Sequence, residues 1–212
     1  NGSNNYSAGL LPISATTFGY NWTAGAGTSN WFTASNWGSN RVPLSNDNVY
    51  IPASAPFQPQ INANGAVCAS IAIEIGASLT MSSSTQYTLT VSGNFTNNGT
   101  FNAGIGVVDF NSSENQTIDG STSTSFYKMN VNKSITNSIL EVKSVISYTA
   151  PSPNDPLLIN TGTFKLSSAS TITPFRNAAN LGLNAKFWNN GGTVSMNNSV
   201  TINSGTIQNT SG

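Results

Sequence analysis

Short alternations of apolar and polar residues, joined by glycine and asparagine corners, run along most of the chain. The clearest is Leu89–Asn102, where LTVSGNFTNNGTFN links two alternations through a Gly-Asn and an Asn-Gly corner. Successive side chains of a strand point to opposite faces, so this pattern predicts a strand, a tight corner and another strand. We expect its apolar side chains to share one core along the chain, namely Leu89, Val91, Phe95, Phe101 and Phe110.

The corner of this stretch recurs in imperfect form. A Gly-Thr-apolar triplet occurs four times: Gly99-Thr100-Phe101, Gly162-Thr163-Phe164, Gly192-Thr193-Val194 and Gly205-Thr206-Ile207. An imperfect repeat of short strands is typical of a stacked, layered β architecture.

The other alternations predict further short strands. They are Ile71–Ile75, Ser78–Met81, Tyr87–Val91, Gly106–Phe110, Lys128–Val131, Ile139–Val145, Leu157–Ile159, Thr163–Leu166, Thr171–Thr173, Thr193–Met196 and Val200–Ile202. No segment shows a convincing helical period, and Asn177–Lys186 comes closest. A doubly wound α/β fold is therefore excluded, because it needs crossover helices.

Two all-β architectures fit these strands. The recurring corners and the abundance of Asn, Ser and Thr, which form ladders between stacked strands, favour a β-solenoid. The unequal intervals between corners and the proline-rich segment Ala150–Pro156 leave a β-sandwich as the alternative. We predict a solenoid-like body at residues 53–212 behind a tryptophan-rich cap at 19–52, together forming one elongated domain at 19–212.

Residues 1–18 form a separate N-terminal extension. Leu10–Phe18 alternates with Leu11, Ile13 and Ala15 on one face, and Pro12 restricts it to an edge or added strand. We predict that it is a donor strand for the uncharged C-terminal run of a neighbouring subunit. The predicted assembly interface consists of Leu10, Leu11, Ile13, Ala15, Phe18, Val200, Ile202 and Ile207.

Three of the four tryptophans, Trp22, Trp31 and Trp37, lie close together in the segment 20–37. Clustered indoles can cover the apolar end of a β stack while their N–H groups find partners at its rim. This is the favoured interpretation, and the alternative is an aromatic platform for sugar rings.

Six segments, taken in chain order, carry a family resemblance. They are Trp22–Trp37, Val42–Pro52, Cys68–Ile71, Gly76–Thr80, Leu89–Asn102 and Phe110–Ile118. In this order they resemble the repeat-rich secreted and surface proteins of Bacteroidetes-type bacteria, over about residues 20–135. The resemblance implies a right-handed parallel β-helix that acts as an adhesin or structural surface component after export through the outer membrane. A C-terminal sorting domain of that family is not visible.

Composition limits the partners. Only 7% of the 212 residues are charged and the net charge is zero, so we expect neither nucleic acid nor an anionic membrane as a partner. No apolar run is long enough to span a membrane. Cys68 is the single cysteine, and its apolar neighbours predict a buried side chain.

No signal peptide is visible, and a start at Asn1 favours a processed chain. We therefore expect an extracellular or cell-surface location after removal of a signal peptide.

The chemistry of an enzyme is largely missing. The chain has no histidine, which excludes His-dependent triads and His-rich metal sites. Among the scattered acids, Asp109, Glu114 and Asp119 form the one close set, and solvated positions in strand and turns explain them better than catalysis. Asn46-Asp47-Asn48 indicates an Asx turn more than a calcium loop. We therefore expect no catalytic residue, cofactor or metal.

Three non-enzymatic functions fit the sequence. The first is a secreted subunit that self-assembles into a surface filament or layer. The second is an adhesive or carbohydrate-binding surface module that binds cell-surface or environmental glycans. The third is an ice-binding solenoid, suggested by Thr88-Leu89-Thr90 and Thr171-Ile172-Thr173.

Overall fold

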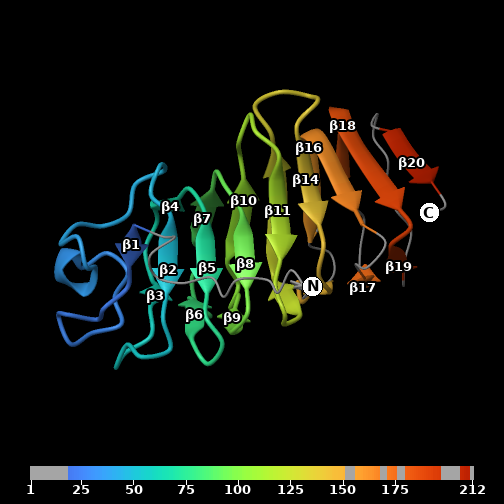
Figure 1. Ribbon diagram of the computed structural model, residues 1–212. Helices are drawn as coiled ribbons and strands as arrows, with labels where there is room; N and C mark the ends of the chain where they lie inside the picture. The colour runs from blue at the N-terminus through green and yellow to red at the C-terminus, as the bar shows by residue number, and fades with distance from the viewer. Residues whose placement is uncertain (1–18, 151–155, 168–170, 176–179, 197–205, 211–212) are drawn as a thin grey trace, which may run out of the picture.

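The chain folds as a β-solenoid of about six turns, as predicted (Figure 1). This computed structural model describes residues 19–150, 156–167, 171–175, 180–196 and 206–210. The ladders between its strands are parallel, for example β5 with β8 and β8 with β11. The β-sandwich alternative is therefore wrong, because sandwiches are built from antiparallel sheets.

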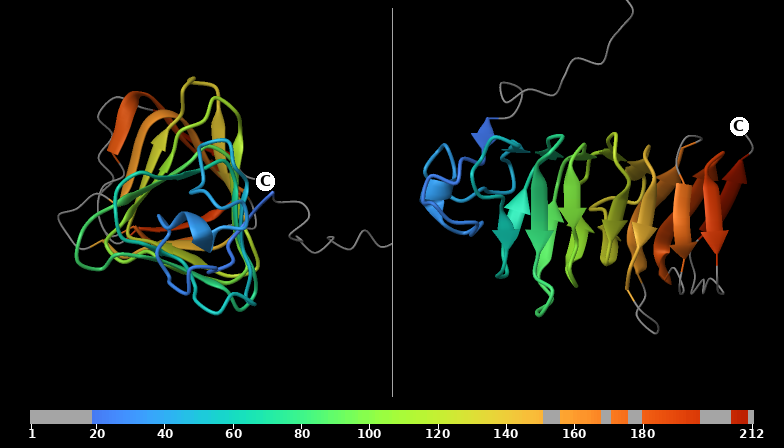
Figure 2. Two further views of the ribbon diagram at one scale, coloured as in Figure 1. Left: turned by 90° about the vertical axis from the view of Figure 1, so that its left-hand side faces the viewer. Right: turned by 90° about the horizontal axis from the view of Figure 1, so that it is seen from below.

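Each turn of the solenoid crosses three faces, and the cross-section is roughly triangular (Figure 2). The first face contains β4 (Ala66–Cys68), β7 (Thr88–Val91), β10 (Val107–Phe110), β13 (Lys128–Asn132) and the first halves of β16 (Leu157–Leu166) and β18 (Asn180–Asn190).

The second face contains β1 (Tyr20–Asn21), β2 (Val49–Ile51), β5 (Ile71–Ile73), β8 (Phe95–Asn97), β11 (Gln116–Asp119), β14 (Ile139–Val142), the second halves of β16 and β18, and β20 (Thr206–Thr210). The third face contains β3 (Gln60–Ile61), β6 (Ser78–Met81), β9 (Thr100–Asn102), β12 (Thr124–Phe126), β15 (Ile146–Tyr148), β17 (Thr171–Phe175) and β19 (Thr193–Met196).

Strand pairing places apolar residues of one turn beside apolar residues of the next. Ile71 pairs with Phe95 and Phe95 pairs with Ile118, so these two turns take 24 and then 23 residues. Within a strand, apolar side chains point inward and polar ones outward, as in β7, where Leu89 and Val91 are buried between half-buried threonines. The two-residue period read from the sequence therefore sets which side of each face forms the core.

Aromatic rings fill the centre of the core. The Phe95 ring lies 5.3 Å from that of Phe101, 6.4 Å from that of Phe110 and 5.7 Å from that of Phe126, between ring centroids. Phe95, Phe110, Leu89 and Val91 are completely buried and Phe101 almost so, which confirms the predicted core. Cys68 is also completely buried, and burial raises the pKa of its thiol.

Glycines permit the turns to stack closely at the corners. A Cβ atom on Gly99 would lie 2.3 Å from the carbonyl oxygen of Glu74 and 2.4 Å from that of Ala77 in the preceding turn. Gly162 has a φ of +90° inside β16, where the chain bends from the first face to the second. Gly99 and Gly192 instead lead onto the third face, so the repeated triplet marks different corners and its intervals are unequal.

Several predicted strands have other bounds in the structure. The predicted strand Ile139–Val145 ends earlier, because β14 stops at Val142 and residues 143–145 form the corner before β15. Leu157–Ile159 and Thr163–Leu166 are the two halves of the single strand β16. The weakly helical segment Asn177–Lys186 is strand from Asn180 onward, since β18 pairs with β16 along its length. Tertiary pairing thus overrides a weak local pattern. Among the described residues, no helix is long and apolar enough to cross a membrane.

Candidate functional site

The tryptophan block forms a closed cap. Trp22, Trp31 and Trp37 have relative exposures of 0%, 0% and 2%, and Trp37 makes edge-to-face contacts with the other two at centroid distances of 4.9 and 4.7 Å. Nε1 of Trp37 donates to the carbonyl oxygen of Trp31 at 2.7 Å, and Nε1 of Trp22 to that of Phe57 at 2.6 Å. Stacking on a sugar requires an exposed ring face. These rings are buried, so the alternative of a glycan platform at Trp22, Trp31 and Trp37 is wrong. The three indoles pack inside the cap.

A buried asparagine shapes the cap loop. Oδ1 of Asn36 accepts from the backbone N–H of Ala26, and its Nδ2 donates to Oγ1 of Thr28 and to the carbonyl oxygen of Asn30. Asn36 is completely buried, so these three hydrogen bonds satisfy its own amide, as polar groups removed from water require.

The acidic residues singled out in the sequence lie apart. Asp109 is on the outer side of β10 and accepts from Nδ2 of Asn132, while Glu114 and Asp119 are exposed. Burial raises the pKa of Asp109, although the hydrogen bond from Asn132 opposes this. Asp47 accepts from the backbone N–H of Leu44 at 2.7 Å and from both terminal nitrogens of the Arg41 guanidinium. The segment is a turn, but not the predicted Asx turn, because the carboxylate of Asp47 bonds backward to Leu44 and not forward along the chain. The described residues contain no group of three or more acids and cysteines placed to hold a metal ion.

The predicted assembly interface is only partly visible. Leu10, Leu11, Ile13, Ala15, Phe18, Val200 and Ile202 lie outside the described residues. Ile207 lies in β20, in register with Phe187 and Phe164 of the two preceding turns. Those two rings are buried, whereas Ile207 has a relative exposure of 45%. An inward-pointing row of the core therefore reaches solvent at this end of the solenoid.

The fourth tryptophan lies on the outer surface of the second face. Glu141, Lys165, Trp188 and Gln208 occupy equivalent outward positions on β14, β16, β18 and β20. The ammonium groups of Lys165 and Lys186 lie 4.8 and 5.1 Å from the centroid of the Trp188 ring. Nε1 of Trp188 donates to Oγ1 of Thr210 at 3.0 Å, which fixes the ring against β20.

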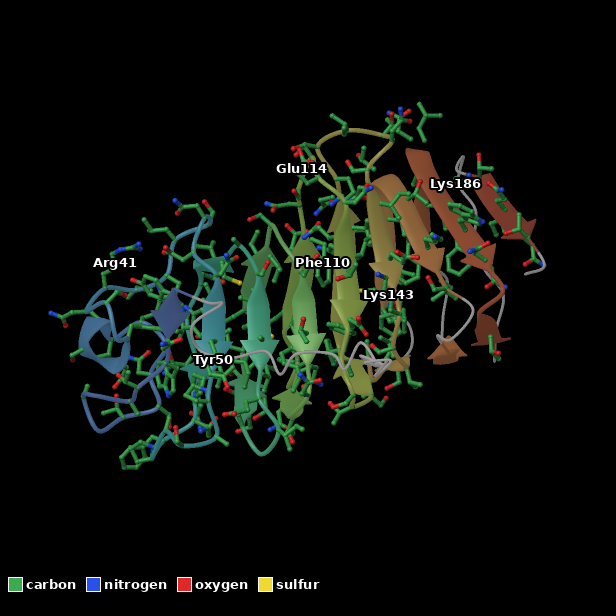
Figure 3. All side chains as sticks on the ribbon, in the orientation of Figure 1. Arg41, Tyr50, Phe110, Glu114, Lys143 and Lys186 are labelled. Carbon is green, nitrogen blue, oxygen red and sulfur yellow. The ribbon has the colours of Figure 1, made fainter. Side chains whose placement is uncertain are left out.

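Two of the seven cationic side chains, Lys143 and Lys165, flank the carboxylate of Glu141 next to this ring. Glu141 accepts from Lys165 at 2.8 Å, lies 3.8 Å from Lys143 and also accepts from the hydroxyl of Ser167. Burial alone would raise the pKa of Glu141, but the hydrogen bonds from Lys165 and Ser167 outweigh it and lower that pKa. Figure 3 shows Lys143 and Lys186 on the C-terminal turns, far from Arg41 in the cap.

Next to Trp188 the surface is hollowed into an open groove of about 550 Å³. It follows the corner between the first and second faces, and its floor is a row of outward residues on four consecutive turns, Ile139, Thr163, Lys186 and Thr206. Its walls are Thr136, Asn137, Leu183, Asn184, Ala185 and Trp188. We refer to this feature as the Trp188 groove. It combines an indole, an ammonium group, hydroxyls and amides, which can stack on and hydrogen-bond to a polar ligand.

Sequence reasoning missed this groove. Trp188 lies just beyond the segment that most resembled a helix, so its alternation with Phe187 was not read as a strand. The available signal was the sequence Ala185-Lys186-Phe187-Trp188, in which a strand buries Ala185 and Phe187 and directs Lys186 and Trp188 outward.

Comparison with known proteins adds one similarity. Residues 21–118, which include the cap and the first turns, match a domain of unknown function (DUF8693). No curated protein and no solved structure matches the chain.

Proposed function

We propose that the protein is a non-enzymatic, extracellular structural subunit that associates end to end into a filament or layer. The observation that carries this proposal is the unpaired side of β20, the last described strand of the solenoid. This strand pairs with β18 on one side, and the described part of the chain places no strand on its other side.

The two ends of the molecule differ. At the N-terminal end, the tryptophan cap covers the core next to β1 and β2. At the other end, β20 has the sequence TIQNT, which carries no charge, and Ile207 leaves apolar surface exposed. Soluble proteins usually protect strand edges with charges, prolines or covering segments, because free N–H and C=O groups pair readily with another chain.

A second copy of the chain is the occupant that we propose for this edge. Leu10–Phe18 carries the alternating apolar residues that strand addition requires, and it would contribute a strand to β20 of the next subunit. A head-to-tail contact of this kind does not close on itself, so repeated addition produces a filament.

The non-enzymatic part of the proposal rests on the missing histidine and the scattered acids. The extracellular part rests on composition. A nearly uncharged surface rich in Asn, Ser and Thr associates readily, which suits a surface layer better than a crowded cytosol.

Light scattering and electron microscopy of three variants test the proposal. We expect polymers from the parent chain, and monomers both after deletion of residues 1–17 and in Ile207→Lys, which places a charge at the β20 end. Ile75→Lys is the matched control, because Ile75 is exposed at a corner away from both ends and should still polymerise. A parent chain that stays monomeric, or polymers that persist in Ile207→Lys, would contradict end-to-end association.

One observation favours glycan binding as a second function. The indole of Trp188 points outward beside its groove, whereas the three indoles of the cap are buried. Nothing comparable favours ice binding: Thr88 and Thr90 lie in β7 on the first face, whereas Thr171 and Thr173 lie in β17 on the third, so they form no common row.

A further inference from the structure

We infer that the Trp188 groove binds acidic polysaccharides through their uronate sugars. Lys186 pairs with the sugar carboxylate, Trp188 packs against the C–H face of the ring, and threonine and asparagine side chains hydrogen-bond to the hydroxyls. This gives the second function a site and a ligand class, and it does not rest on end-to-end association.

The shape of the groove fits a chain of sugars. Its floor crosses four consecutive turns in the order Ile139, Thr163, Lys186 and Thr206, so a ligand lying along the solenoid axis meets a residue of each turn. Thr206 is exposed on one side of Lys186, Thr163 lines the groove on the other side although it is largely buried, and Asn137 contributes an amide at the wall. Hydroxyls and amides can both donate and accept, which matches the hydroxyl groups of a sugar.

The charges in the groove select an acidic ligand. Glu141 already neutralises Lys165, with 2.8 Å between their charged atoms. Among the described residues Lys186 has no carboxylate partner, and its ammonium group instead lies over the ring of Trp188. The groove therefore holds one cation whose charge is not balanced by an acid of the solenoid.

The contact between Lys186 and Trp188 links charge recognition to ring stacking. A carboxylate binds an ammonium group more strongly than an aromatic face does, so a uronate draws Lys186 away from the indole. The part of the ring that Lys186 leaves becomes available to the sugar, while Lys165, which is held by Glu141, stays over the rest of the indole. A neutral sugar would have to displace the ammonium group without replacing its partner, and so binds more weakly.

A nucleic acid fits this site poorly. Binding along a phosphate backbone requires a track of several cations, and most of the affinity comes from that track. Here the net charge of the chain is zero and the groove has a single unbalanced lysine. Glycans and single-stranded nucleic acids both stack on indoles, so the experiment includes both.

Intrinsic tryptophan fluorescence measures binding directly, because the other three indoles are buried in the cap and Trp188 alone lies in the groove. The acidic probes are hexasaccharides of galacturonic acid, of mannuronic acid and of hyaluronan. The methyl-esterified galacturonic acid hexamer is the neutral control, and a dT hexamer is the nucleic-acid control. We expect at least one acidic hexamer to bind with a Kd below about 1 mM. The esterified hexamer and the dT hexamer should bind with a Kd at least about tenfold higher.

Variants locate the site, and circular dichroism confirms that each is folded. Calorimetry should show about tenfold weaker binding in Lys186→Gln and in Trp188→Ala, a loss of about 1.4 kcal/mol each. Lys128→Gln, at an outward position on the first face, is the matched control and should change affinity less than about twofold. The inference is overturned if no acidic hexamer binds, if the esterified hexamer or dT binds equally well, or if folded Lys186→Gln keeps full affinity.

Discussion

The ammonium group of Lys133 donates to the side-chain oxygen of Gln116 at 2.5 Å, at a corner where both residues are buried. Nζ of Lys133 also donates to the carbonyl oxygen of Glu114, and Nε2 of Gln116 donates to those of Val91 and Gly93. Two side chains thus satisfy carbonyl groups of successive turns where the chain passes from the first face to the second. At this corner, polar side chains therefore add to the backbone hydrogen bonds between turns, such as the one from the N–H of Lys133 to the carbonyl oxygen of Thr161.

This corner gives stability a specific pH dependence. Burial lowers the pKa of Lys133 to about 8, below its ordinary value of 10.5. Between these two values the unfolded chain binds more protons than the folded one, so the Lys133 contribution to the free energy of unfolding rises as pH increases from about 8 toward 10.

The measurement is the free energy of unfolding by urea at pH 7, 8, 9 and 10, in the parent and in Lys133→Met. We expect Lys133→Met to lose about 1–3 kcal/mol at pH 8, because Gln116 is left without its donor. The difference between the two proteins should widen in favour of the parent as pH rises. A difference that stays constant over this range would mean that Lys133 titrates normally.

Phe95 is predicted to be the most costly ring to remove from the core. Phe95→Ala leaves a cavity among Phe101, Phe110 and Phe126, and we expect a loss of about 3–5 kcal/mol in the free energy of unfolding. Leu44→Ala, at an exposed position, should change it by less than about 0.5 kcal/mol. Similar unfolding midpoints for the two variants would refute the central position of Phe95.

Gly99 tests the close stacking of the corners. Gly99→Ala places a Cβ atom against two carbonyl oxygens of the preceding turn, so we expect a loss of about 1–3 kcal/mol, as for overpacking elsewhere. Gly19→Ala is the control, since a Cβ there meets no atom within 4 Å and the residue has no left-handed φ. If both variants melt at the parent temperature, the turns at Gly99 lie further apart than described.

Cys68 reports on opening of the core. Its burial and raised pKa predict that the folded protein does not react with a thiol reagent at pH 8, whereas the protein unfolded in guanidinium reacts fully. Ser83→Cys, at an exposed position on the loop after β6, supplies a positive control that should react at once in the folded state. Rapid reaction of Cys68 in folded parent protein would show that the first turns open readily.

The sequence predicts the inside of this fold better than its corners. Leu89, Val91 and Phe95 follow a two-residue period that any half-buried strand must show, so their burial could be predicted without knowing which strands pair. Which glycine stacks on which turn depends on the length of each intervening loop. For that reason Gly99 and Gly162, which look alike in the sequence, lie at different corners.

The local sequence could have indicated the outward side chains of Lys186 and Trp188, but not the groove that they help to form. Leu181 and Ala185, both buried, are four residues apart, a spacing that satisfies one helical turn as well as two repeats of a strand. Pairing with β16 decides between them, and that pairing is set by residues some twenty positions away. The groove then arises from side chains of four different turns, which no single window of sequence contains.

The parallel stacking of turns has a mechanical consequence. The ladder hydrogen bonds run along the long axis of the solenoid, from each turn to the next, so a force that pulls the two ends apart acts on one ladder at a time. Each released turn of 23 or 24 residues would lengthen the chain by about 80 Å. Under tension the described solenoid would therefore extend in steps, one turn at a time.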